Sequence, residues 1–336
     1  MTRCFAIAAV SSTLMAGCTK DLSSGGGAAD SGGGSSTVDC DTIVVDTQPV
    51  NGATDHYYRD PVVFQLSEPD PTATVMADFA GSVSVSDDGL TITFSPDQPL
   101  EASSDYSVAL DYCYGRPEIS FETSAYGAPL EASTDIEGAV YTLKFTDGDY
   151  TVGASAGELL NAVFSRPILI QLQETDGPYL DIVAAVGKVG VSPTEQDTCG
   201  RTLLVNHVST DNLRSSGHIS GGVEDQIFGA NRGLLRFDSF DFEGTVSADG
   251  MSLGGIRYGA EMGVAEMVAL LPEFGDEDAV CLLADNLDIP CEPCGTDPDL
   301  LCIQIAAEHI SGARLATSVV EIEEVGVHED CESDED

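Results

Sequence analysis

Short stretches in which apolar and polar residues alternate recur early in the chain. In the stretch 90–95, for example, Leu90, Ile92 and Phe94 occupy every second position. Because successive side chains of a strand point to opposite faces of a sheet, this alternation predicts a strand with one buried face. The stretches with this character are 43–45, 61–66, 82–86, 90–95, 106–110 and 119–121. Their close spacing predicts an antiparallel β-sandwich over residues 38–124.

A turn signal joins two of these stretches. The sequence Asp87-Asp88-Gly89 separates 82–86 from 90–95. Glycine tolerates the positive φ that tight turns need, so the two stretches are predicted to form a β-hairpin. The alternation in 82–86 places Val83 and Val85 on the inward face, where we expect them to join the core.

The turn and core residues of this region also recur in the order of a known family. Gln-Pro-Val-Asn-Gly-Ala at 48–53 precedes the strand that leads into Ser67-Glu68-Pro69, and 88–96 reads Asp-Gly-Leu-Thr-Ile-Thr-Phe-Ser-Pro. Together with Leu100 and Tyr106, these residues resemble the bacterial immunoglobulin-like (Ig-like) domains first described in S-layer proteins. The resemblance implies a spacer, adhesion or display module without catalytic residues. Leu100 and Tyr106 flank a corner at which the tyrosine hydroxyl is expected to hydrogen-bond back to the backbone.

Residues 128–331 are predicted to form a second, β-rich domain that resembles no family we recognise. The predicted strands are 140–145, 150–152, 168–172, 180–189, 202–208, 234–242, 302–307 and 315–322. Apolar residues at helical spacing predict short helices over 157–164 and 262–271. The predicted fold class is therefore mainly β: an Ig-like sandwich followed by a disulfide-stapled sandwich or barrel with one or two short helices.

Four glycine-containing segments of this second domain are predicted to be turns. Asp147-Gly148 and Asp249-Gly250 carry the signal of a two-residue hairpin turn between predicted strands. Ser220-Gly221-Gly222 and Gly254-Gly255 lack the lysine of a phosphate-binding loop, so turns are the favoured interpretation there too.

The start of the chain combines a basic residue, an apolar run and small residues before a cysteine. Arg3 provides the charge, and the apolar run in residues 1–17 is too short to span a bilayer as a mature helix. Met15-Ala16-Gly17-Cys18 resembles the lipobox of bacterial lipoproteins, although Met15 stands where leucine is usual. The resemblance implies cleavage after Gly17 and lipidation of Cys18. An ordinary signal peptide with a chance cysteine is the alternative.

Residues 18–37 contain the lipidation site and a Gly/Ser-rich linker. Such a segment behaves as a flexible tether between a lipid anchor and a folded body. Thr19 rather than aspartate follows Cys18, which by resemblance to enterobacterial sorting favours the outer membrane. We therefore expect a lipid-anchored protein of the cell envelope, on the periplasmic or the surface face of that membrane.

Ten cysteines are present. Cys4 leaves with the signal and Cys18 takes the lipid, which leaves an even number in an exported chain. Such a set predicts disulfides. The remaining cysteines are Cys40, Cys113, Cys199, Cys281, Cys291, Cys294, Cys302 and Cys331. We expect Cys40 to pair with Cys113 across the sandwich. In the second domain, the expected pairs are Cys294–Cys302, Cys281–Cys291 and Cys199–Cys331, out of several possible arrangements.

Two other interpretations of these cysteines stay open. Cys291-Glu-Pro-Cys294, with Cys302 and His309, has some of the ligands of a zinc site, and the Cys-x-x-Cys spacing also occurs in redox pairs. A zinc site usually shows two such cysteine pairs or a histidine at ligand spacing. Structural disulfides are therefore favoured, and no metal site is predicted.

The charge is strongly negative: 13 basic residues face 57 acidic ones, for a net charge of −44. A surface of this sign repels phosphate backbones, so nucleic acid is not expected as a partner. The acidic residues are spread through the chain, with a short tail at 332–336. Acidic loops at 147–149 and 297–299 offer oxygens to Ca²⁺, but neither follows the EF-hand pattern. Solvated loops are the favoured interpretation.

No residue set carries the signature of a catalytic site. Sets drawn from Ser215, Ser216, His207, His218 and Asp211 lack a nucleophile elbow, and spacing alone makes no triad. We therefore expect a protein that is not an enzyme and needs no cofactor.

The expected function is that of an exported lipoprotein acting as a non-catalytic surface or periplasmic interaction or spacer module. Its expected partners are the membrane, through the anchor, and a protein or other component of the envelope. The alternative is a binding protein for a small apolar or lipid ligand, held in the second domain by surface from Leu159, Val163, Phe164 and 180–189. An apolar cavity of several hundred Å³ would favour the alternative, and a filled core would count against it.

Overall fold

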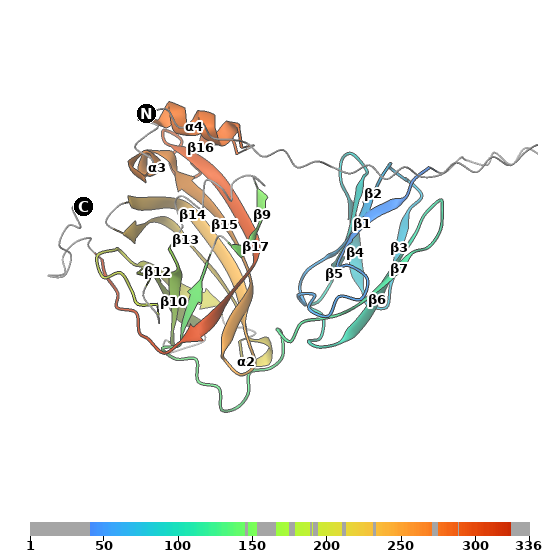
Figure 1. The fold of residues 1–336 in the computed structure, drawn as a ribbon, viewed down its shortest axis with the longest axis horizontal. Coiled ribbons are helices and arrows are strands. Elements are labelled where there is room, and N and C mark those ends of the chain that lie inside the picture. The colour runs from blue at the N-terminus through green and yellow to red at the C-terminus, as the bar shows by residue number, and fades with distance from the viewer. Residues whose placement is uncertain are drawn as a thin grey trace, which may run out of the picture. The chain divides into compact units, whose positions relative to one another are not determined.

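The computed structural model describes most of the chain after residue 40. The described residues are 41–144, 147–152, 166–174, 179–188, 190, 194–209, 213–230, 233–270, 275–287 and 289–323. They form a β-sandwich followed by an eight-stranded β-barrel, which confirms the predicted fold class and decides between sandwich and barrel for the second part (Figure 1). Segments 1–17 and 18–37, the helix predicted at 157–164 and the tail at 332–336 lie outside the described residues.

Two antiparallel sheets make the sandwich. The first has the order β1-β2-β5-β4 and the second β3-β6-β7. Their bounds are β1 Val44–Gln48, β2 Val62–Leu66, β3 Thr74–Ala77, β4 Gly81–Val85, β5 Thr91–Pro96, β6 Asp105–Asp111 and β7 Glu118–Glu122. The predicted strands are all present, and the short β3 is an addition that the alternation did not reveal.

Most of the alternate residues that the pattern placed inward form the sandwich core, but Val83 and Val85, which were expected to join it, are exposed. Phe64 on β2 and Ile92 on β5 are paired across the first sheet and are almost fully buried. Leu110 and Phe121 cover them from the second sheet, within the same core cluster. Burial of such side chains stabilises a fold by ~1.5–3 kcal/mol each before the entropy of ordering is subtracted.

The predicted tyrosine corner is confirmed. The backbone N–H of Glu101 donates a hydrogen bond to the hydroxyl oxygen of Tyr106 at 2.9 Å. The tyrosine ring also lies edge-on to Phe79, with ring centroids 5.3 Å apart. The side chain therefore fixes the turn before β6 to the second sheet.

The barrel is an up-and-down meander that closes on itself. Its strands are β8 Val140–Leu143, β10 Ile168–Glu174, β11 Tyr179–Val186, β12 Leu203–Ser209, β13 His218–Ala230, β14 Gly233–Val246, β15 Ser252–Gly263 and β17 Leu301–Leu315. Each pairs antiparallel with the next, and the long β17 pairs with both β15 and β8. This double pairing joins the last strand to the first and removes the sheet edges.

Short elements add to this framework. Strands β9 (Asp149–Val152) and β16 (Cys291–Pro293) both pair with β17. The helices are α2 (Leu213–Ser216), α3 (Val264–Leu270) and α4 (Glu277–Asp285). Helices α3 and α4 lie at the end of the barrel near β16 (Figure 1) and contribute Val264, Met267, Val280 and Ala284 to its core. The helix predicted at 262–271 is α3, whereas α4 was not predicted.

Several of the hairpins and turns predicted in the second domain are not present. Strands β8 and β9 do not form the hairpin expected around Asp147-Gly148, because each pairs with β17 instead. Residues Ser220–Gly222 lie inside β13 rather than in a turn. A Cβ at Gly222 would lie 2.3 Å from Oδ1 of Asp241, so glycine permits a close approach between strands. Gly254-Gly255 is likewise within β15, at a register shift, and Gly255 has a φ of 57°.

The strand predicted over 315–322 is also absent, because β17 ends at Leu315. Two of the apolar residues that suggested it, Val319 and Ile322, are buried all the same, whereas Val320 is exposed. Side chains rather than a neighbouring strand satisfy the backbone there: the N–H of Val319 donates to Oε1 of Gln171 at 2.6 Å. The N–H of Val320 donates to Oε1 of Gln196 at 2.7 Å.

All six described cysteines are disulfide-bonded. Two of the expected bonds, Cys281–Cys291 and Cys294–Cys302, are present with Cα atoms 5.5 and 5.0 Å apart. Cys113 and Cys199 are also disulfide-bonded, while Cys40 and Cys331, their expected partners, lie outside the described residues. The second domain is thus disulfide-stapled as predicted.

None of the helices in the described part of the chain has the length and apolar character that crossing a bilayer requires.

Removing the hydroxyl of Tyr106 should weaken the sandwich. We expect Tyr106→Phe to lower the free energy of unfolding by ~0.5–1.5 kcal/mol, because the N–H of Glu101 loses its partner. Urea denaturation monitored by circular dichroism measures the change. The matched control is Tyr114→Phe, since Tyr114 is 72% exposed and its variant should unfold like the native protein. Equal destabilisation by both substitutions would contradict the assignment.

Candidate functional site

A short segment of the sandwich, His56–Asp60, lies against the outside of the barrel. Its two tyrosines meet at one buried barrel residue: the hydroxyls of Tyr57 and Tyr58 lie 2.6 and 3.2 Å from Oγ1 of Thr245. Thr245 is fully buried, on β14. Burial raises the pKa of Tyr57, so the phenol stays neutral and hydrogen-bonds to Thr245.

A glycine makes room for this contact. A Cβ at Gly255 would lie 2.0 Å from the ring of Tyr57, and the residue has a positive φ. Any side chain there would both strain the backbone and push the ring out. The function of Gly254-Gly255 is therefore to admit an aromatic ring from the sandwich.

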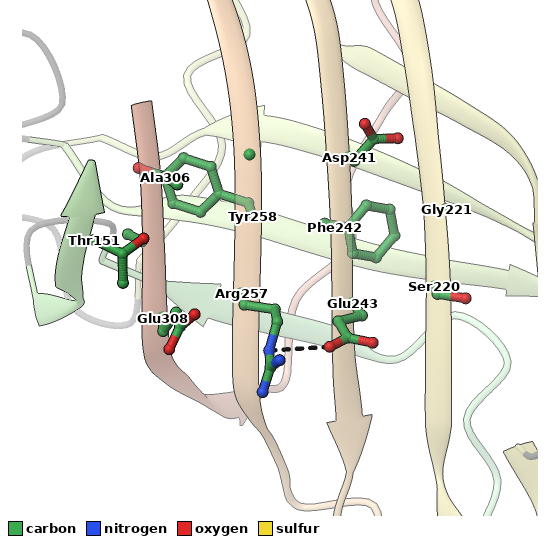
Figure 2. A pocket seen from close by; sticks show the side chains of 12 residues that line it. Thr151, Ser220, Gly221, Asp241, Phe242, Glu243, Arg257, Tyr258, Ala306 and Glu308 are labelled. Atoms are coloured by element: carbon green, nitrogen blue, oxygen red, sulfur yellow. Dashed lines mark ion pairs between the residues drawn. The ribbon is translucent and has the colours of Figure 1, made fainter. Parts of the chain in front are cut away.

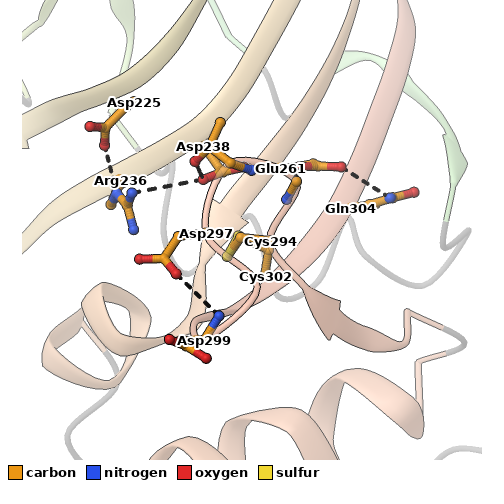
Figure 3. The surroundings of a disulfide bond; sticks show 11 residues. Asp225, Arg236, Asp238, Glu261, Cys294, Asp297, Asp299, Cys302 and Gln304 are labelled. Carbon is orange, nitrogen blue, oxygen red and sulfur yellow. Dashed lines mark hydrogen bonds and ion pairs between the residues drawn. A yellow bond between two sulfur atoms is a disulfide. The ribbon is translucent and has the colours of Figure 1, made fainter.

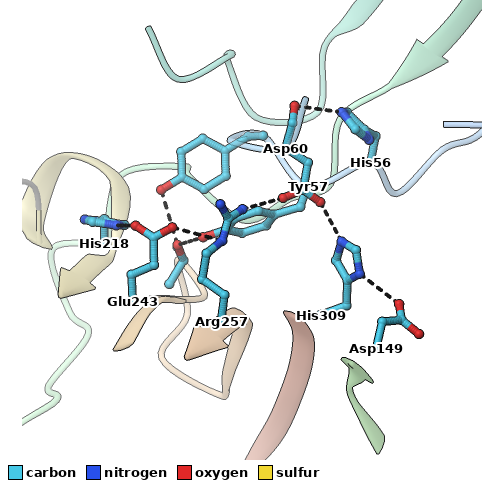
Figure 4. A network of polar contacts seen from close by, with 10 residues as sticks. His56, Tyr57, Asp60, Asp149, His218, Glu243, Arg257 and His309 are labelled. Carbon is cyan, nitrogen blue, oxygen red and sulfur yellow. Dashed lines mark hydrogen bonds and ion pairs between the residues drawn. The ribbon is translucent and has the colours of Figure 1, made fainter. Parts of the chain in front are cut away.

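A chain of alternating charges runs beside the tyrosines (Figure 4). Its members, in spatial order, are Asp149, His309, Asp60, Arg257, Glu243 and His218. They come from β9, β17, the sandwich segment, β15, β14 and β13. We call this set the charge chain; it brings together residues up to 249 positions apart in the sequence.

Asp60 is the centre of the charge chain. Its side chain is 6% exposed, and one carboxylate oxygen accepts from Nη2 of Arg257 at 2.6 Å. The other lies 2.7 Å from Nε2 of His309. Taking a carboxylate out of water is costly unless cations and hydrogen bonds replace the water. Here two barrel residues compensate a charge that the sandwich provides.

His309 is held as a cation between two carboxylates. Its Nε2 faces Asp60 and its Nδ1 lies 2.9 Å from Oδ2 of Asp149. Both ring nitrogens donate only in the protonated imidazolium. The hydrogen bond to Asp60, with further support from Asp149 and against the effect of burial, raises the pKa of His309 to about 9.

The other two histidines of the region have different surroundings. Burial lowers the pKa of His56, although Asp60 partly offsets this effect. Nε2 of His218 lies 3.3 Å from Oε2 of Glu243. This hydrogen bond, helped by Arg257 and opposed by burial, lowers the pKa of the Glu243 carboxyl group. Glu243 is thus kept ionised, which suits a binding or structural role better than that of a general acid.

A groove of about 550 Å³ opens next to the charge chain (Figure 2). We call it the outer groove. Its lining residues are Thr151, Ser220, Gly221, Asp241, Phe242, Glu243, Arg257, Tyr258, Gly259, Ala306, Ala307 and Glu308. The volume is within the ~300–1,000 Å³ typical of small-molecule sites.

Strand register explains the shape of the outer groove. Asp241, Gly259 and Ala306 are paired across β14, β15 and β17, so they share one face. Small side chains there leave a hollow between larger ones. Glu243 and Arg257 are paired in the adjacent row of the same face and form one wall.

The outer groove carries an excess of negative charge. Asp241, Glu243 and Glu308 contribute carboxylates, whereas Arg257 is the sole cation among the described lining residues and is already paired with Asp60 and Glu243. The lining contains hydroxyls but neither histidine nor cysteine. This chemistry suits hydrogen bonding and cation binding rather than nucleophilic catalysis.

In contrast, an apolar space in the barrel interior is small. Between described residues such as Leu143, Phe228 and Tyr258 it measures about 40 Å³. One water molecule takes up ~30 Å³ of the liquid, and a ligand site needs several hundred. The described interior thus gives no support to the alternative function, an apolar ligand held in the second domain.

The cysteines considered as metal ligands are all in disulfides: Cys291 is bonded to Cys281, and Cys294 to Cys302 (Figure 3). Asp238, Cys294 and Cys302 come together, and no other group of potential ligands of this kind occurs in the described part of the chain. Both sulfurs belong to the Cys294–Cys302 disulfide, which leaves no thiolate for a metal.

Asp238 instead holds the disulfide loop on β14. Its carboxylate accepts hydrogen bonds from the backbone N–H of Thr296, at 2.8 Å, and from the Thr296 hydroxyl. Burial acts to raise the pKa of Asp238, but the hydrogen bonds from Thr296 prevail and lower it. The ionised carboxylate is therefore a structural partner of the loop.

The residues considered as metal ligands or catalytic groups from the sequence thus have other partners in the structure. His309, weighed as a zinc ligand, bridges Asp60 and Asp149, and Asp149 of the acidic loop 147–149 is its partner rather than part of a calcium pattern. His218 faces Glu243, and His207 lies edge-on to Tyr179. Neither of these contacts includes a serine.

Sequence reasoning missed the charge chain and the outer groove altogether. Asp60 and Arg257 carry no motif, and they meet only because the sandwich segment docks on β15. The small residues of the groove, Gly221, Gly259 and Ala306, carry no motif either, and only Gly221 belonged to a segment predicted as a turn.

Comparisons with known proteins leave the family open. No family model matches the chain, and no curated protein matches it. Among solved structures, an L,D-transpeptidase from Mycobacterium smegmatis aligns with 51% of this chain and 76% of its own, at 13% identity and a TM-score of 0.21. A similarity this slight carries no argument about fold or activity.

Protonated His309 should contribute to stability in a defined pH range. Its pKa in the folded protein, about 9, exceeds the 6.5 of an ordinary histidine, so its contribution is complete below pH 6.5 and disappears as the pH rises through 9. We expect His309→Asn to destabilise the protein at pH 6.5 and to have a smaller effect at pH 10. Urea unfolding over this pH range measures the difference.

The control for this experiment is His207→Asn. His207 and His309 have nearly the same positive φ, 59° and 60°, and asparagine tolerates that conformation. The control variant should show no comparable pH dependence. A destabilisation by His309→Asn that stays constant from pH 6.5 to 10 would show that the charge of His309 contributes nothing.

Proposed function

We propose that this chain is an exported lipoprotein, anchored in the cell envelope through Cys18, that acts as a non-catalytic interaction and spacer module. The observation that carries the proposal is the oxidised state of every described cysteine. Disulfides persist outside the cytosol and are rare within it. The signal-like segment 1–17, the lipobox-like Met15–Cys18 and the linker 18–37 support the same compartment.

The non-catalytic part of the proposal rests on the outer groove and the barrel interior. The apolar space between the described interior residues is too small for a ligand, and the described lining of the outer groove offers carboxylates and hydroxyls but neither histidine nor cysteine. Binding at the outer groove is the role that this chemistry favours. The sandwich, which resembles S-layer-type Ig-like domains, is proposed to space the barrel from the membrane.

The proposed anchor predicts the mass of the native protein. Protein extracted from membranes with detergent should begin at Cys18, carry acyl chains on that residue and contain no free thiol. Intact-mass analysis with and without reductant measures all three properties. Cys18→Ser should release the chain from the membrane fraction. A native chain that begins at Met1 with reduced cysteines would contradict the proposal.

The outer groove predicts a substitution that blocks binding without affecting the fold. A Cβ at Gly259 would meet no atom within 4 Å, so Gly259→Trp should fold and fill the hollow, while Gly259→Ala leaves it open. The protein is expressed in its native cells with a photo-crosslinking residue in place of Thr151. After irradiation, we expect a covalent adduct with an envelope component, both in the otherwise native protein and in Gly259→Ala. The adduct should be lost in Gly259→Trp.

An adduct that persists in Gly259→Trp, or none in the otherwise native protein, would exclude the outer groove as the binding surface. Thermal melts of both Gly259 variants serve as the folding control.

A further inference from the structure

Unpaired strand edges are sites at which another chain can add a strand. The eight barrel strands close on themselves, and only the short β9 and β16, which pair with β17, end that sheet. The sandwich has four edge strands: β1 and β4 in one sheet, β3 and β7 in the other. Soluble proteins protect such edges with charges, prolines, bulges, short length or a covering segment. The four edges differ in how far they are protected.

Three of these edges carry protection. Strand β1 has a register shift and a charged residue, Asp46. Strand β3 is only four residues long. Strand β7 is covered by the segment before the tyrosines: the N–H of Gly52 donates to the carbonyl oxygen of Ser120, and the N–H of Glu122 donates to that of Ala53.

Strand β4 carries none of these devices. Its sequence is Gly-Ser-Val-Ser-Val, without charge or proline, and its pairing with β5 is regular from Gly81 to Val85. No described residue pairs with its other side. The strand is therefore an open edge with a plain, extended backbone.

The hydrogen-bond pattern shows which backbone groups are open. Next to β4, the N–H of Ser86 donates to the carbonyl oxygen of Thr91, and the N–H of Asp97 donates to that of Ala80. The backbone groups of residues 80 and 86 therefore face β5. Antiparallel pairing alternates along the strand, which puts Ser82 and Ser84 on the same side as these two. The backbone groups of Gly81, Val83 and Val85 consequently point away from β5, toward the open edge.

The side chains at this edge are apolar and uncovered. Val83 and Val85 pair with Phe94 and Ile92, so they face the core side of the sheet as the sequence predicted. They do not join the core, however: Val83 is 50% exposed and Val85 57%. The second sheet does not cover them, and a further strand beside β4 would place its own apolar side chains against them.

Charge decides which strand fits. Carboxylates flank both ends of β4: Asp78 and Asp97 at its start, Asp87 and Asp88 after its end. The described sandwich contains two basic residues, Arg59 and Arg116, and neither belongs to β4 or β5. A second copy of a chain with a net charge of −44 would oppose acid to acid at both ends. A strand with basic residues at its ends meets the opposite charge instead.

We propose that β4 is a docking site for strand addition, and that its partner is an extended, cationic segment of another protein. The segment has apolar side chains at alternate positions, opposite Val83 and Val85, and lysine or arginine at both ends. Backbone hydrogen bonds to Val83 and Val85 provide the affinity, as in other cases of β-augmentation. The site lies on the sandwich and is separate from the outer groove, so each stands or fails without the other.

The test uses a synthetic peptide and the full mature chain. The probe is acetyl-Lys-Lys-Val-Thr-Val-Thr-Val-Lys-Lys-amide with a fluorophore, titrated by anisotropy at low ionic strength. We expect saturable binding that weakens as salt rises. Val83→Pro removes the open-edge N–H without touching the bonds to β5, and proline is tolerated on an edge of this kind. It should weaken binding about tenfold or more.

Matched controls separate strand addition from charge alone. Val83→Ala loses at least as much apolar surface as Val83→Pro but keeps the N–H, so it should bind more tightly than Val83→Pro. A peptide with N-methyl groups on alternate residues should bind poorly to the unaltered protein, which covers the case that Val83→Pro disturbs the fold. A peptide with glutamate in place of lysine should also bind poorly.

The proposal would be overturned if the peptide bound equally well to folded Val83→Pro and folded Val83→Ala. Equal binding of the N-methylated and plain peptides would also overturn it. So would the absence of saturable binding of the lysine peptide. Self-association of the unaltered protein that Val83→Pro abolishes would identify a second copy as the occupant and would likewise refute the cationic partner.

Discussion

A carboxylate removed from water must find its counter-charges within the protein, and Asp60 finds them on the barrel. The sandwich supplies the anion, and Arg257 and His309 supply the cations, with Glu243 and Asp149 balancing these in turn. Moving the segment that carries Asp60 away from its partners would leave a buried charge unpaired, which is strongly unfavourable. The ion pairs therefore hold this segment against the barrel. The tyrosines beside it add apolar burial and hydrogen bonds to Thr245. The contact between the two β structures thus combines a buried carboxylate with two buried tyrosines, and it depends on Gly255, which leaves room for the ring of Tyr57.

The larger of the two spaces described in the barrel lies on its outer face and not in its interior. An eight-stranded barrel has an interior just wide enough for side chains to fill, and the apolar space between the described interior side chains is about 40 Å³. On its outer face, Gly259 and Ala306 leave a hollow that lies beside the charge chain. Glycines on the barrel strands have two different effects. Gly255 leaves room for the ring of Tyr57, whereas Gly259 leaves open space.

Negative charge relates the two candidate binding surfaces to each other. The outer groove and the ends of β4 both present carboxylates with few cations nearby, so each favours a partner of positive charge. They recognise such a partner in different ways. The outer groove offers side-chain oxygens in a hollow, whereas β4 offers a backbone edge with two exposed valines. A molecule tethered to a membrane and equipped with both surfaces would suit an interaction module, as proposed.

The sequence by itself determined the strands whose two faces differ, because alternation of apolar and polar residues is a local consequence of one face being buried. The sandwich strands belong to this class. The Asp249-Gly250 turn was predicted from its hairpin signal, the tyrosine corner with the resemblance to Ig-like domains, and two short-range disulfides as expected pairs among several arrangements. Only the tertiary structure decided that β17 closes a barrel, that glycines inside β13 and β15 permit close approach rather than turns, and that Val83 and Val85 stay exposed on an inward face. It also decided the charge chain, since Asp60 and His309 are 249 residues apart. The physical reason is that strand partners and docked segments are chosen by the whole fold, through register and burial, and leave no periodic trace in the chain.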